Sequence, residues 1–413
     1  MIYLDHAAAT PVSRKAEIAM RDYFSAQFFN PSAPYLPAKH VRDNYEFAKN
    51  RIAHTIGAKG ADLIITAGAT ESINLAFTAV LNLPVLNPSA LNLPKTDAPE
   101  ILILETEHAS VRAAAKHYAE ISGAKLTEIN VDKTGLIDLK DFRKKINKNT
   151  VFVSISLANN ELGTIQPLAE IAEIIRDERD QRLQAHLKSS NAKDDAPLPL
   201  FLHSDASQAL NLIDISVSRL GVNLLTINSA KIGGPKGVGA LYVDHDVKLS
   251  PIIYGGGQEA GLRSGTENVP AVIGFAEAAE EAKAHIKSNY KKYQELSSIL
   301  KAELKKCKVL EPIFLGNLKH QLANFCPVSF PGVDAERLIY KLEEKQVYLS
   351  TGAACSANKG TVSHVLKAIK LSDAEIAGSL RISLGVLNTR ENVKEAGKLI
   401  REAVEEEYAR TSS

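Results

Sequence analysis

Six short apolar runs alternate with helical patterns between about residues 60 and 245, and this alternation constrains the fold more than any other feature. The runs are rich in Leu, Ile and Val and occupy residues 62–66, 101–105, 151–157, 200–203, 223–228 and 239–243. Strands that are apolar on both faces and separated by helices form a largely parallel sheet covered on both sides. We therefore predict an α/β fold whose binding crevice lies at the carboxyl ends of the strands.

The pattern changes after residue 258, where long helical stretches follow with a few short strands. We predict a large domain over residues 15–262 and a smaller α+β domain made of residues 1–14 and 263–413. The expected helices and strands of the second domain are 271–306, 391–410, 323–330 and 346–349. Two stretches of the large domain, 81–100 and 186–199, are rich in proline or polar residues and are expected on the surface.

The charge balance and the cysteine content exclude several classes of protein. The chain has 49 Lys and Arg against 48 Asp and Glu, so no basic field would attract nucleic acid or an anionic membrane. Three cysteines without a CxxC pair form neither a disulfide framework nor a Cys-rich zinc site, and they favour a reduced, cytoplasmic setting. The N-terminus lacks the pattern of a signal peptide, and no apolar run approaches the roughly 18 residues that span a bilayer.

The motif AGATES follows the first predicted strand and opens a helix. Gly68 permits a tight turn there. The unpaired amides at the helix start, together with the Thr70 hydroxyl, would form a cradle for an anion such as phosphate. The same residues are also typical of an ordinary helix cap, so the motif alone does not decide between the two interpretations.

Asp205 and Lys231 each follow another predicted strand. Asp205 is either the cap of the ASQAL helix or the counterion of a buried cation, since a buried carboxylate needs a partner. Lys231 comes directly after NLLTIN, where burial would lower its pKa and produce an amine nucleophile. Lys236 is the competing lysine, but its Gly-Pro-Lys-Gly setting is typical of an exposed turn.

A phosphate cradle, an aspartate and a lysine at successive strand ends together predict a site for pyridoxal 5'-phosphate. The lysine would bond to the cofactor, and the aspartate would keep its pyridine nitrogen protonated so that the ring can accept electrons. The sequence contains no GxxxxGK[ST], HExxH or EF-hand motif, so we expect no metal site. Cys355 lies in LSTGAACSANKGT, a stretch of small residues typical of a mobile loop from which a thiolate could reach the crevice.

These motifs, taken in order, identify a family. The chain resembles the group I cysteine desulfurases, the NifS/IscS type, within the class V aminotransferase family of fold-type I pyridoxal phosphate enzymes. The motifs that carry the resemblance are LDHAAATP, NPS, AGATES, TEH, NNELG, HSDASQ, AKIGGPKGVGALYV, GGGQEAGLRSGTENV and TGAACS. The resemblance implies a mainly parallel seven-stranded sheet in the large domain beside a smaller α+β domain.

The resemblance also implies roles at the cofactor. Lys231 would hold the cofactor and move the α-proton of the substrate, Asp205 would pair with the pyridinium, and His108 would stack on the ring. Gln208 and Asn160 would bond to the side of the ring that carries the phenolic oxygen.

Further roles follow at the phosphate and at the substrate. Ala69, Thr70 and Asn228 would hold the phosphate, and Thr266 would reach the phosphate of a partner subunit, which implies a homodimer. Arg381, with Asn30 and Asn160 nearby, would bind the substrate carboxylate through its bidentate fork. Cys355 would be the nucleophile that takes sulfur from L-cysteine and passes it to an acceptor protein.

The sequence departs from the family pattern at several places. The Ser-Gly-His that usually precedes the lysine is Asn228, Ser229 and Ala230 here, so two expected phosphate ligands are replaced. Asn228 and Ser229 are the candidates to compensate for them. A family histidine near the substrate is also absent unless His40 takes its place.

Three hypotheses follow, and the first is a cysteine desulfurase. The second is a selenocysteine lyase or another class V enzyme; Cys355 favours desulfuration over transamination, because transamination needs no thiol. The third is a non-catalytic binding or sulfur-relay protein, motivated by the altered phosphate ligands. The presence of Lys231, Asp205 and His108 together at strand ends argues against it.

Overall fold

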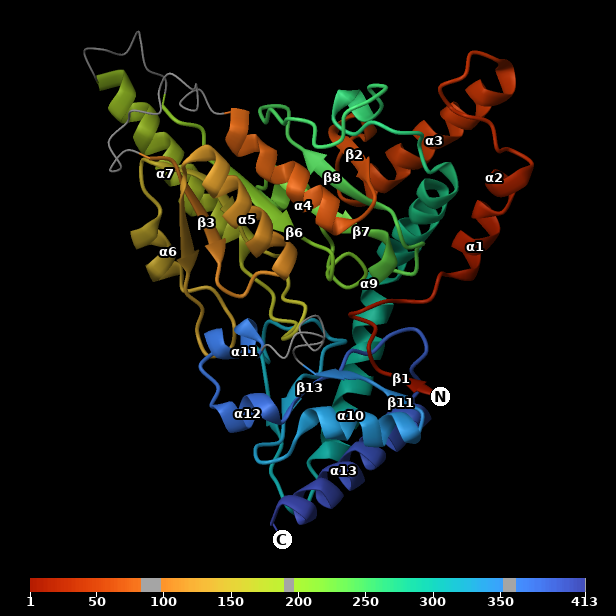
Figure 1. Ribbon diagram of the computed structural model, residues 1–413, viewed down its shortest axis with the longest axis vertical. Helices are drawn as coiled ribbons and strands as arrows, with labels where there is room; N and C mark the ends of the chain where they lie inside the picture. The colour runs from red at the N-terminus through yellow and green to blue at the C-terminus, as the bar shows by residue number, and fades with distance from the viewer. Residues whose placement is uncertain (83–97, 189–196, 352–361, 413) are drawn as a thin grey trace.

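The fold is built on a central seven-stranded sheet (Figure 1). The computed structural model describes residues 1–82, 98–188, 197–351 and 362–412. The strands, in their order across the sheet, are β2 (Leu63–Thr66), β8 (Gly239–Val243), β7 (Leu224–Asn228), β6 (Phe201–Asp205), β5 (Thr150–Ser154), β3 (Glu100–Leu104) and β4 (Lys125–Ile129). β8 runs antiparallel to both of its neighbours, and the other neighbouring pairs are parallel. The predicted mainly parallel α/β sheet is therefore confirmed.

Two layers of helices cover the sheet, as strands that are apolar on both faces require. Alternate residues of β2 show the division, because Leu63 and Ile65 face one layer and Ile64 faces the other. The first layer contains α3 (Leu36–Thr55), α6 (Leu139–Lys145), α7 (Leu168–Lys188) and the first part of α9 (Val269–Leu304). The second contains α4 (Ala69–Phe77) and α5 (Ala109–Ser122).

Strand β4 is absent from the sequence prediction, and its composition explains why. Its sequence, KLTEI, is polar, and its first four residues are exposed or half-buried because it lies at the edge of the sheet. It pairs in parallel with β3 over five residues. An edge strand of this kind lacks the apolar run by which the other strands are recognised.

A second hydrophobic core lies below the first in Figure 1. It includes a four-stranded sheet of β12 (Ser350–Thr351), β13 (Ser379–Arg381), β10 (Val328–Ser329) and β9 (Ile313–Phe314). β1 (Ile2–Tyr3) pairs in parallel with β11 (Val347–Tyr348). The N-terminal segment thus packs with the C-terminal part of the chain, although the domain boundaries stay a prediction.

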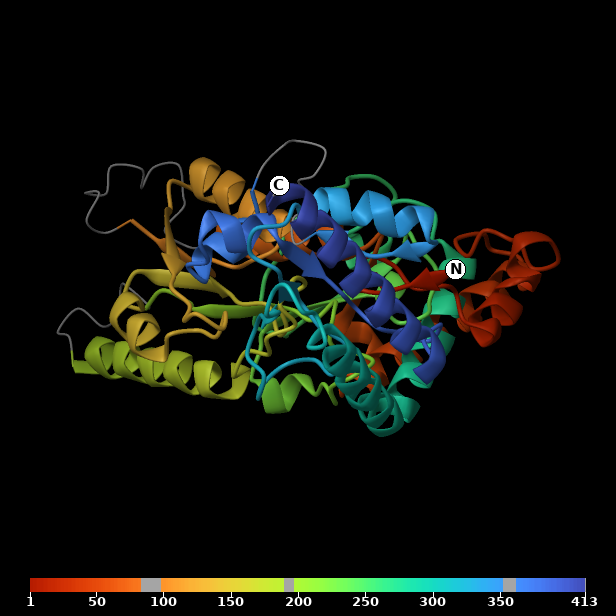
Figure 2. The same cartoon turned by 90° about the horizontal axis from the view of Figure 1, so that it is seen from below.

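The 36-residue helix α9 joins the two cores. Residues from Val269 to Ala282 pack in the first core, and residues from Tyr293 to Leu304 pack in the second. Figure 2, seen from below, shows α10 (Ala335–Glu344) and α13 (Arg390–Ser412), which pack in the second core. The remaining α-helices are α1 (Arg14–Met20), α2 (Asp22–Ser25), α8 (Val217–Leu220), α11 (His364–Ala368) and α12 (Asp373–Ala377). Among the described residues, no helix is both long and apolar enough to cross a membrane.

Candidate functional site

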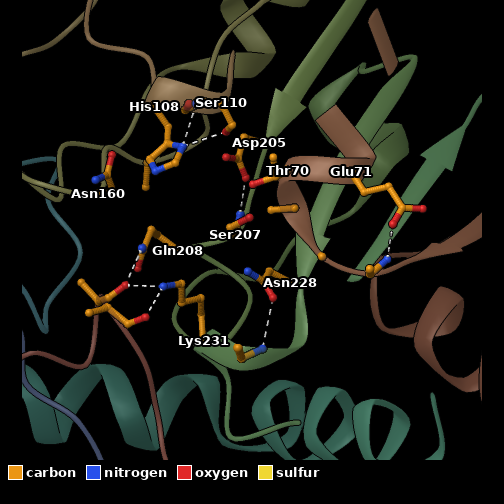
Figure 3. Close-up of a pocket in the computed structure, with 18 of the residues that line it drawn as sticks. Thr70, Glu71, His108, Ser110, Asn160, Asp205, Ser207, Gln208, Asn228 and Lys231 are labelled. Atoms are coloured by element: carbon orange, nitrogen blue, oxygen red, sulfur yellow. Dashed lines mark hydrogen bonds between the residues drawn. The ribbon is translucent and has the colours of Figure 1, made fainter. Parts of the chain in front are cut away.

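A cavity of about 790 Å³ opens at the carboxyl ends of the central strands (Figure 3). The segments that follow β2, β3, β5, β6 and β7 all contribute to its wall. This is the crevice that the alternating pattern predicts, because parallel strands end at the same edge of a sheet. The N-terminal residues Ala7 and Ala8 and the side chain of Arg381 close it on another side.

The start of α4 forms one wall of the cavity. Gly68 has a φ of 148°, which favours glycine, and no side chain caps the helix after it. The first amides of α4, at Ala69 and Thr70, therefore stand open at the cavity, as an anion site requires. The charge of nearby Glu71 is balanced, because Arg263 lies 2.9 Å from its carboxylate.

Asp205 is the last residue of β6 and lies in the cavity wall. Its Oδ1 accepts a hydrogen bond from the Ser207 amide at 2.9 Å, so it supports the local turn. The predicted ASQAL helix is absent, because residues 207–212 form turns, so Asp205 caps no helix. One carboxylate oxygen holds the turn, and the group still lines the cavity (Figure 3).

Lys231 reaches the same cavity from the turn after β7. Its Nζ donates to the carbonyl oxygens of Ala7 at 2.8 Å and Ala8 at 2.5 Å. Gln208 Nε2 donates to the Ala7 oxygen as well, at 3.1 Å. Lys236, by contrast, is exposed, as its turn sequence predicts.

His108 caps the N-terminus of α5 and lines the cavity. Its Nδ1 accepts from the Ser110 amide at 3.2 Å and lies 2.7 Å from the Ser110 hydroxyl. Burial lowers the pKa of His108, and Asp205 opposes that change. A neutral ring whose Nδ1 accepts from an amide carries its hydrogen on Nε2. His108 is therefore held as a neutral ring with a fixed orientation.

Arg381 enters the cavity from β13. Its Nη2 lies 2.8 Å from Asp5 Oδ1, and its Nη1 donates weakly to the Asn160 main-chain oxygen at 3.4 Å. Asn160 lines the cavity beside it. Residues 5, 160 and 381 are far apart in sequence, and the packing of the two cores brings them to one place.

The three residues before Lys231 have different positions. Asn228 lines the cavity, and its Oδ1 accepts from the Ala230 amide at 3.2 Å, so its Nδ2 is the group that can donate to a ligand. Ser229 is fully buried away from the cavity. Of the two candidates to replace the family's phosphate ligands, the structure places Asn228 there and not Ser229.

Besides Ser229, three described residues named from the sequence do not line this cavity, and a further one cannot be placed. Asn30 is exposed and accepts from the Ser32 amide at 2.9 Å, and His40 is exposed on α3. Thr266 is exposed in a second cavity of about 240 Å³, whose wall shares Ala67 and Gly237 with the first. Cys355 lies outside the described residues.

Two buried carboxyl groups behind the cavity have no counterpart in the sequence prediction. Burial raises the pKa of Glu107 to about 8 and that of Glu161 to about 7. Glu107 accepts from the Ser156 amide at 2.6 Å and shares a short hydrogen bond with the Ser156 hydroxyl. Glu161 accepts from Ser363 at 2.7 Å. Glu107 lies in the motif TEH and Glu161 in NNELG, and both motifs are typical of the family. These motifs are the sequence signal by which the two residues could have been predicted.

The comparison with known protein families agrees with this geometry. The family model described as "Aminotransferase class-V" matches residues 2–183 and 195–395, which is most of the chain. The chain belongs to the class V aminotransferase family. The residues that line the cavity all lie within the parts of the chain that this class V family model matches.

Curated relatives narrow the assignment within the class V family. The chain is 37% identical over 393 residues to "Cysteine desulfurase IscS 1" of Archaeoglobus fulgidus, covering 95% of this chain and 94% of that protein. It is 34% identical over 392 residues to "Cysteine desulfurase IscS" of Dictyoglomus turgidum, covering 95% and 91%. These relatives place the chain in the NifS/IscS-type branch of the family.

A solved structure supports the fold assignment. A "NIFS-LIKE PROTEIN" superposes with a TM-score of 0.83 at 29% identity and covers 97% of this chain and 98% of its own. Another, entitled "SspA in complex with cysteine", has a TM-score of 0.75 at 29% identity, covering 93% and 99%. The names of the relatives favour cysteine desulfuration over the selenocysteine lyase alternative.

Proposed function

We propose that this protein is a cysteine desulfurase that uses pyridoxal 5'-phosphate. It would convert L-cysteine to L-alanine and leave the sulfur as a persulfide on Cys355. The observation that carries the proposal is the meeting of three groups in one cavity: the open start of α4, Asp205 and Lys231. Membership of the cysteine desulfurase branch supports the same reaction.

The groups in the cavity fit this cofactor. The uncapped amides at Ala69 and Thr70 suit a phosphate, and Asn228 Nδ2 adds a donor at that end. Asp205 suits a protonated pyridine nitrogen, and the Lys231 amine suits an aldehyde. A cavity of about 790 Å³ is within the usual range for a cofactor and a small substrate. When bound, pyridoxal phosphate supplies an electron sink for the α-carbon of the substrate.

The residues of the chain would then divide the work as follows. Lys231 would hold the cofactor, and its amine would accept the α-proton of the substrate. His108, a neutral ring fixed by Ser110, would stack on the cofactor ring. Gln208 and Asn160 would bond to the side of the ring that carries the phenolic oxygen. Arg381 binds the substrate carboxylate and so fixes which bond of the substrate faces Lys231.

Sulfur transfer would fall to Cys355. Its thiolate attacks the substrate sulfur, so a new S–S bond forms while the bond between that sulfur and the substrate β-carbon breaks. The electron pair of the broken bond stays with the carbon, which takes up a proton to become the methyl group of alanine. The terminal persulfide sulfur then passes to an acceptor protein for iron–sulfur cluster or thio-cofactor and tRNA synthesis. Such chemistry fits the cytoplasmic setting predicted from the cysteine content.

We further infer a homodimer in which Thr266 completes the site of the partner. Thr266 is exposed in the second cavity, next to the residues shared with the first, and it does not reach the first cavity within its own chain. Several large apolar side chains are exposed in the segment from α1 to α3 and near Thr266. They include Phe24, Phe28, Phe47 and Tyr254, each at least 66% exposed. A second copy of the chain would cover such side chains.

The reaction is tested by counting products. The purified protein, supplied with pyridoxal phosphate and a thiol reductant, should release alanine and sulfide from L-cysteine in equal amounts. Cys355→Ser should keep the colour of the bound cofactor and lose sulfide release, whereas Cys307→Ser is the matched control and should behave as wild type. Full sulfide release by Cys355→Ser would contradict the proposed persulfide.

A further inference from the structure

The guanidinium of Arg381 is already paired with a carboxylate of its own chain. Arg381 Nη2 donates to Asp5 Oδ1 at 2.8 Å, and the two side chains are only 5% and 18% exposed. Nε is buried and has no hydrogen-bond partner among the described residues, so a ligand cannot reach it. Nη1 makes only the long 3.4 Å bond to the Asn160 oxygen. Nη1 is therefore the part of the guanidinium that is least committed to the protein.

Asp5 is held in place through its main chain. It forms a bridge with Ser383, and its carbonyl oxygen accepts from the Tyr3 hydroxyl at 2.8 Å and from the Ala8 amide at 3.0 Å. Arg381 is equally fixed, because β13 is paired on both sides, with β12 and with β10. Neither backbone can withdraw without breaking strand pairing, so the main chains hold the two side chains within reach of each other.

Asp5 also lies in the field of both cationic groups of the site. Burial raises the pKa of the Asp5 carboxyl, and Arg381 and then Lys231 act against that rise. A substrate carboxylate that enters the cavity would be attracted by the same two cations. Asp5 thus already neutralises part of the positive charge that would attract a substrate carboxylate. It does so through its hydrogen bond with Arg381 Nη2.

We propose that Asp5 is a specificity-determining residue that competes with the substrate carboxylate for Arg381. The inference rests on the proposed function, since it takes Arg381 as the group that binds the substrate carboxylate. A single carboxylate can use the uncommitted Nη1, whereas a second carboxylate finds the charge of Arg381 balanced and is repelled by Asp5. The pair therefore limits the affinity for small anions and disfavours dicarboxylic amino acids.

The test uses a ligand that the enzyme cannot turn over. 3-Mercaptopropionate has the carboxylate and the sulfur of cysteine but no amine, so it cannot bond to the cofactor. Its dissociation constant is measured by calorimetry on the cofactor-loaded protein. Asp5→Asn keeps an oxygen that accepts from Nη2 and removes the charge, so binding should tighten by roughly threefold or more. Mercaptosuccinate, which has a second carboxylate, should gain more.

Two controls isolate the effect. Asp180→Asn makes the same charge change at an exposed position of α7 and should leave the dissociation constant unchanged. 2-Mercaptoethanol, which has neither the carboxylate nor an amine, should bind Asp5→Asn and wild type equally. Asp5→Ser is a second variant without the charge, in case Asp5→Asn does not fold, and the same tightening is expected in it.

Unchanged or weaker binding of 3-mercaptopropionate would overturn the inference. Weaker binding is the result expected if Asp5 only positions Arg381, so the sign of the change separates competition from support. Failure of the proposed function would look different. It would show as an absence of alanine from L-cysteine in the wild-type protein, whereas failure of this inference shows only in the dissociation constants of the variants.

Discussion

The two halves of the cavity are built in different ways. The half proposed to hold the cofactor comes from the ends of strands of one sheet. Asp205 is the last residue of β6, and Thr70, His108 and Lys231 follow the ends of β2, β3 and β7 within one helical turn. The half proposed to hold the substrate joins Asp5, from the N-terminal segment, to Arg381 on β13 of the second unit. One half depends on a single sheet, and the other on how two cores pack together.

The difference concerns charge as well as construction. In the cofactor half, Asp205 remains available to a ligand. One of its carboxylate oxygens accepts from the Ser207 amide, and the group still lines the cavity. In the substrate half, the main cation is already neutralised by Asp5. We therefore expect substitutions in the first half to abolish function and substitutions in the second to tune affinity.

The largest effect is expected for Asp205→Asn. The amide keeps an oxygen that accepts from Ser207 but cannot neutralise a protonated pyridine nitrogen, so kcat/KM should fall about 100-fold or more. The rate of alanine formation measures it, and Asp180→Asn on exposed α7 is the matched control. A rate within about threefold of wild type would mean that Asp205 is only a turn residue.

Arg381→Lys should raise KM for L-cysteine by about tenfold or more, because lysine has a single nitrogen where arginine uses Nη2 for Asp5 and keeps Nη1 for the substrate carboxylate. We expect kcat to change less than KM, because the cofactor half is untouched. Steady-state kinetics separate the two, with the exposed Arg14→Lys as control. A loss confined to kcat would contradict the division between the two halves.

Asn228→Ala should weaken binding of pyridoxal phosphate by about tenfold, as expected for one hydrogen bond to a charged group. Asn228 has two roles, the cap on the Ala230 amide and the proposed donation from Nδ2. Asn228→Asp separates them: it keeps a capping oxygen and replaces the donor with a negative charge, so it should bind the cofactor more weakly still. Wild-type affinity in Asn228→Asp, measured by absorbance titration, would assign the residue to capping alone.

The smallest effect on catalysis is expected for Glu107, which lies behind the cavity and acts on stability instead. Its pKa of about 8 lies above the ordinary value of 4.5, so between these pH values the folded protein holds a proton that the unfolded chain releases. Stability therefore falls as pH rises through this window. Glu107→Gln can keep both bonds to Ser156 and does not titrate, so the free energy of unfolding of this variant should fall by about 3 kcal/mol less than that of wild type between pH 5 and 8.

Denaturant unfolding at several pH values measures this difference. Glu173→Gln, at an exposed position of α7, is the control and should keep the slope of wild type. An identical slope in Glu107→Gln would mean that Glu107 is already ionised in the folded protein at pH 5.

The cofactor half could be predicted from the sequence, because each of its residues follows a local apolar run that is visible without the rest of the chain. Strand β4 was missed, since its polar residues at a sheet edge carry no such signal. The pairing of Asp5 with Arg381 could not be predicted by position, because it spans 376 residues and arises only when the two cores meet. Asn30 and Thr266 stay predictions, because this chain alone does not bring them to the cavity.

The most direct test of the proposed cofactor half is to trap the cofactor on the chain. The purified protein is incubated with pyridoxal phosphate, reduced with borohydride to fix the cofactor on the amine that holds it, digested and mapped by mass spectrometry. We predict that Lys231 carries the label and that exposed Lys236, five residues away, does not. No label on Lys231, or equal labelling of the two lysines, would contradict the assignment of this cavity.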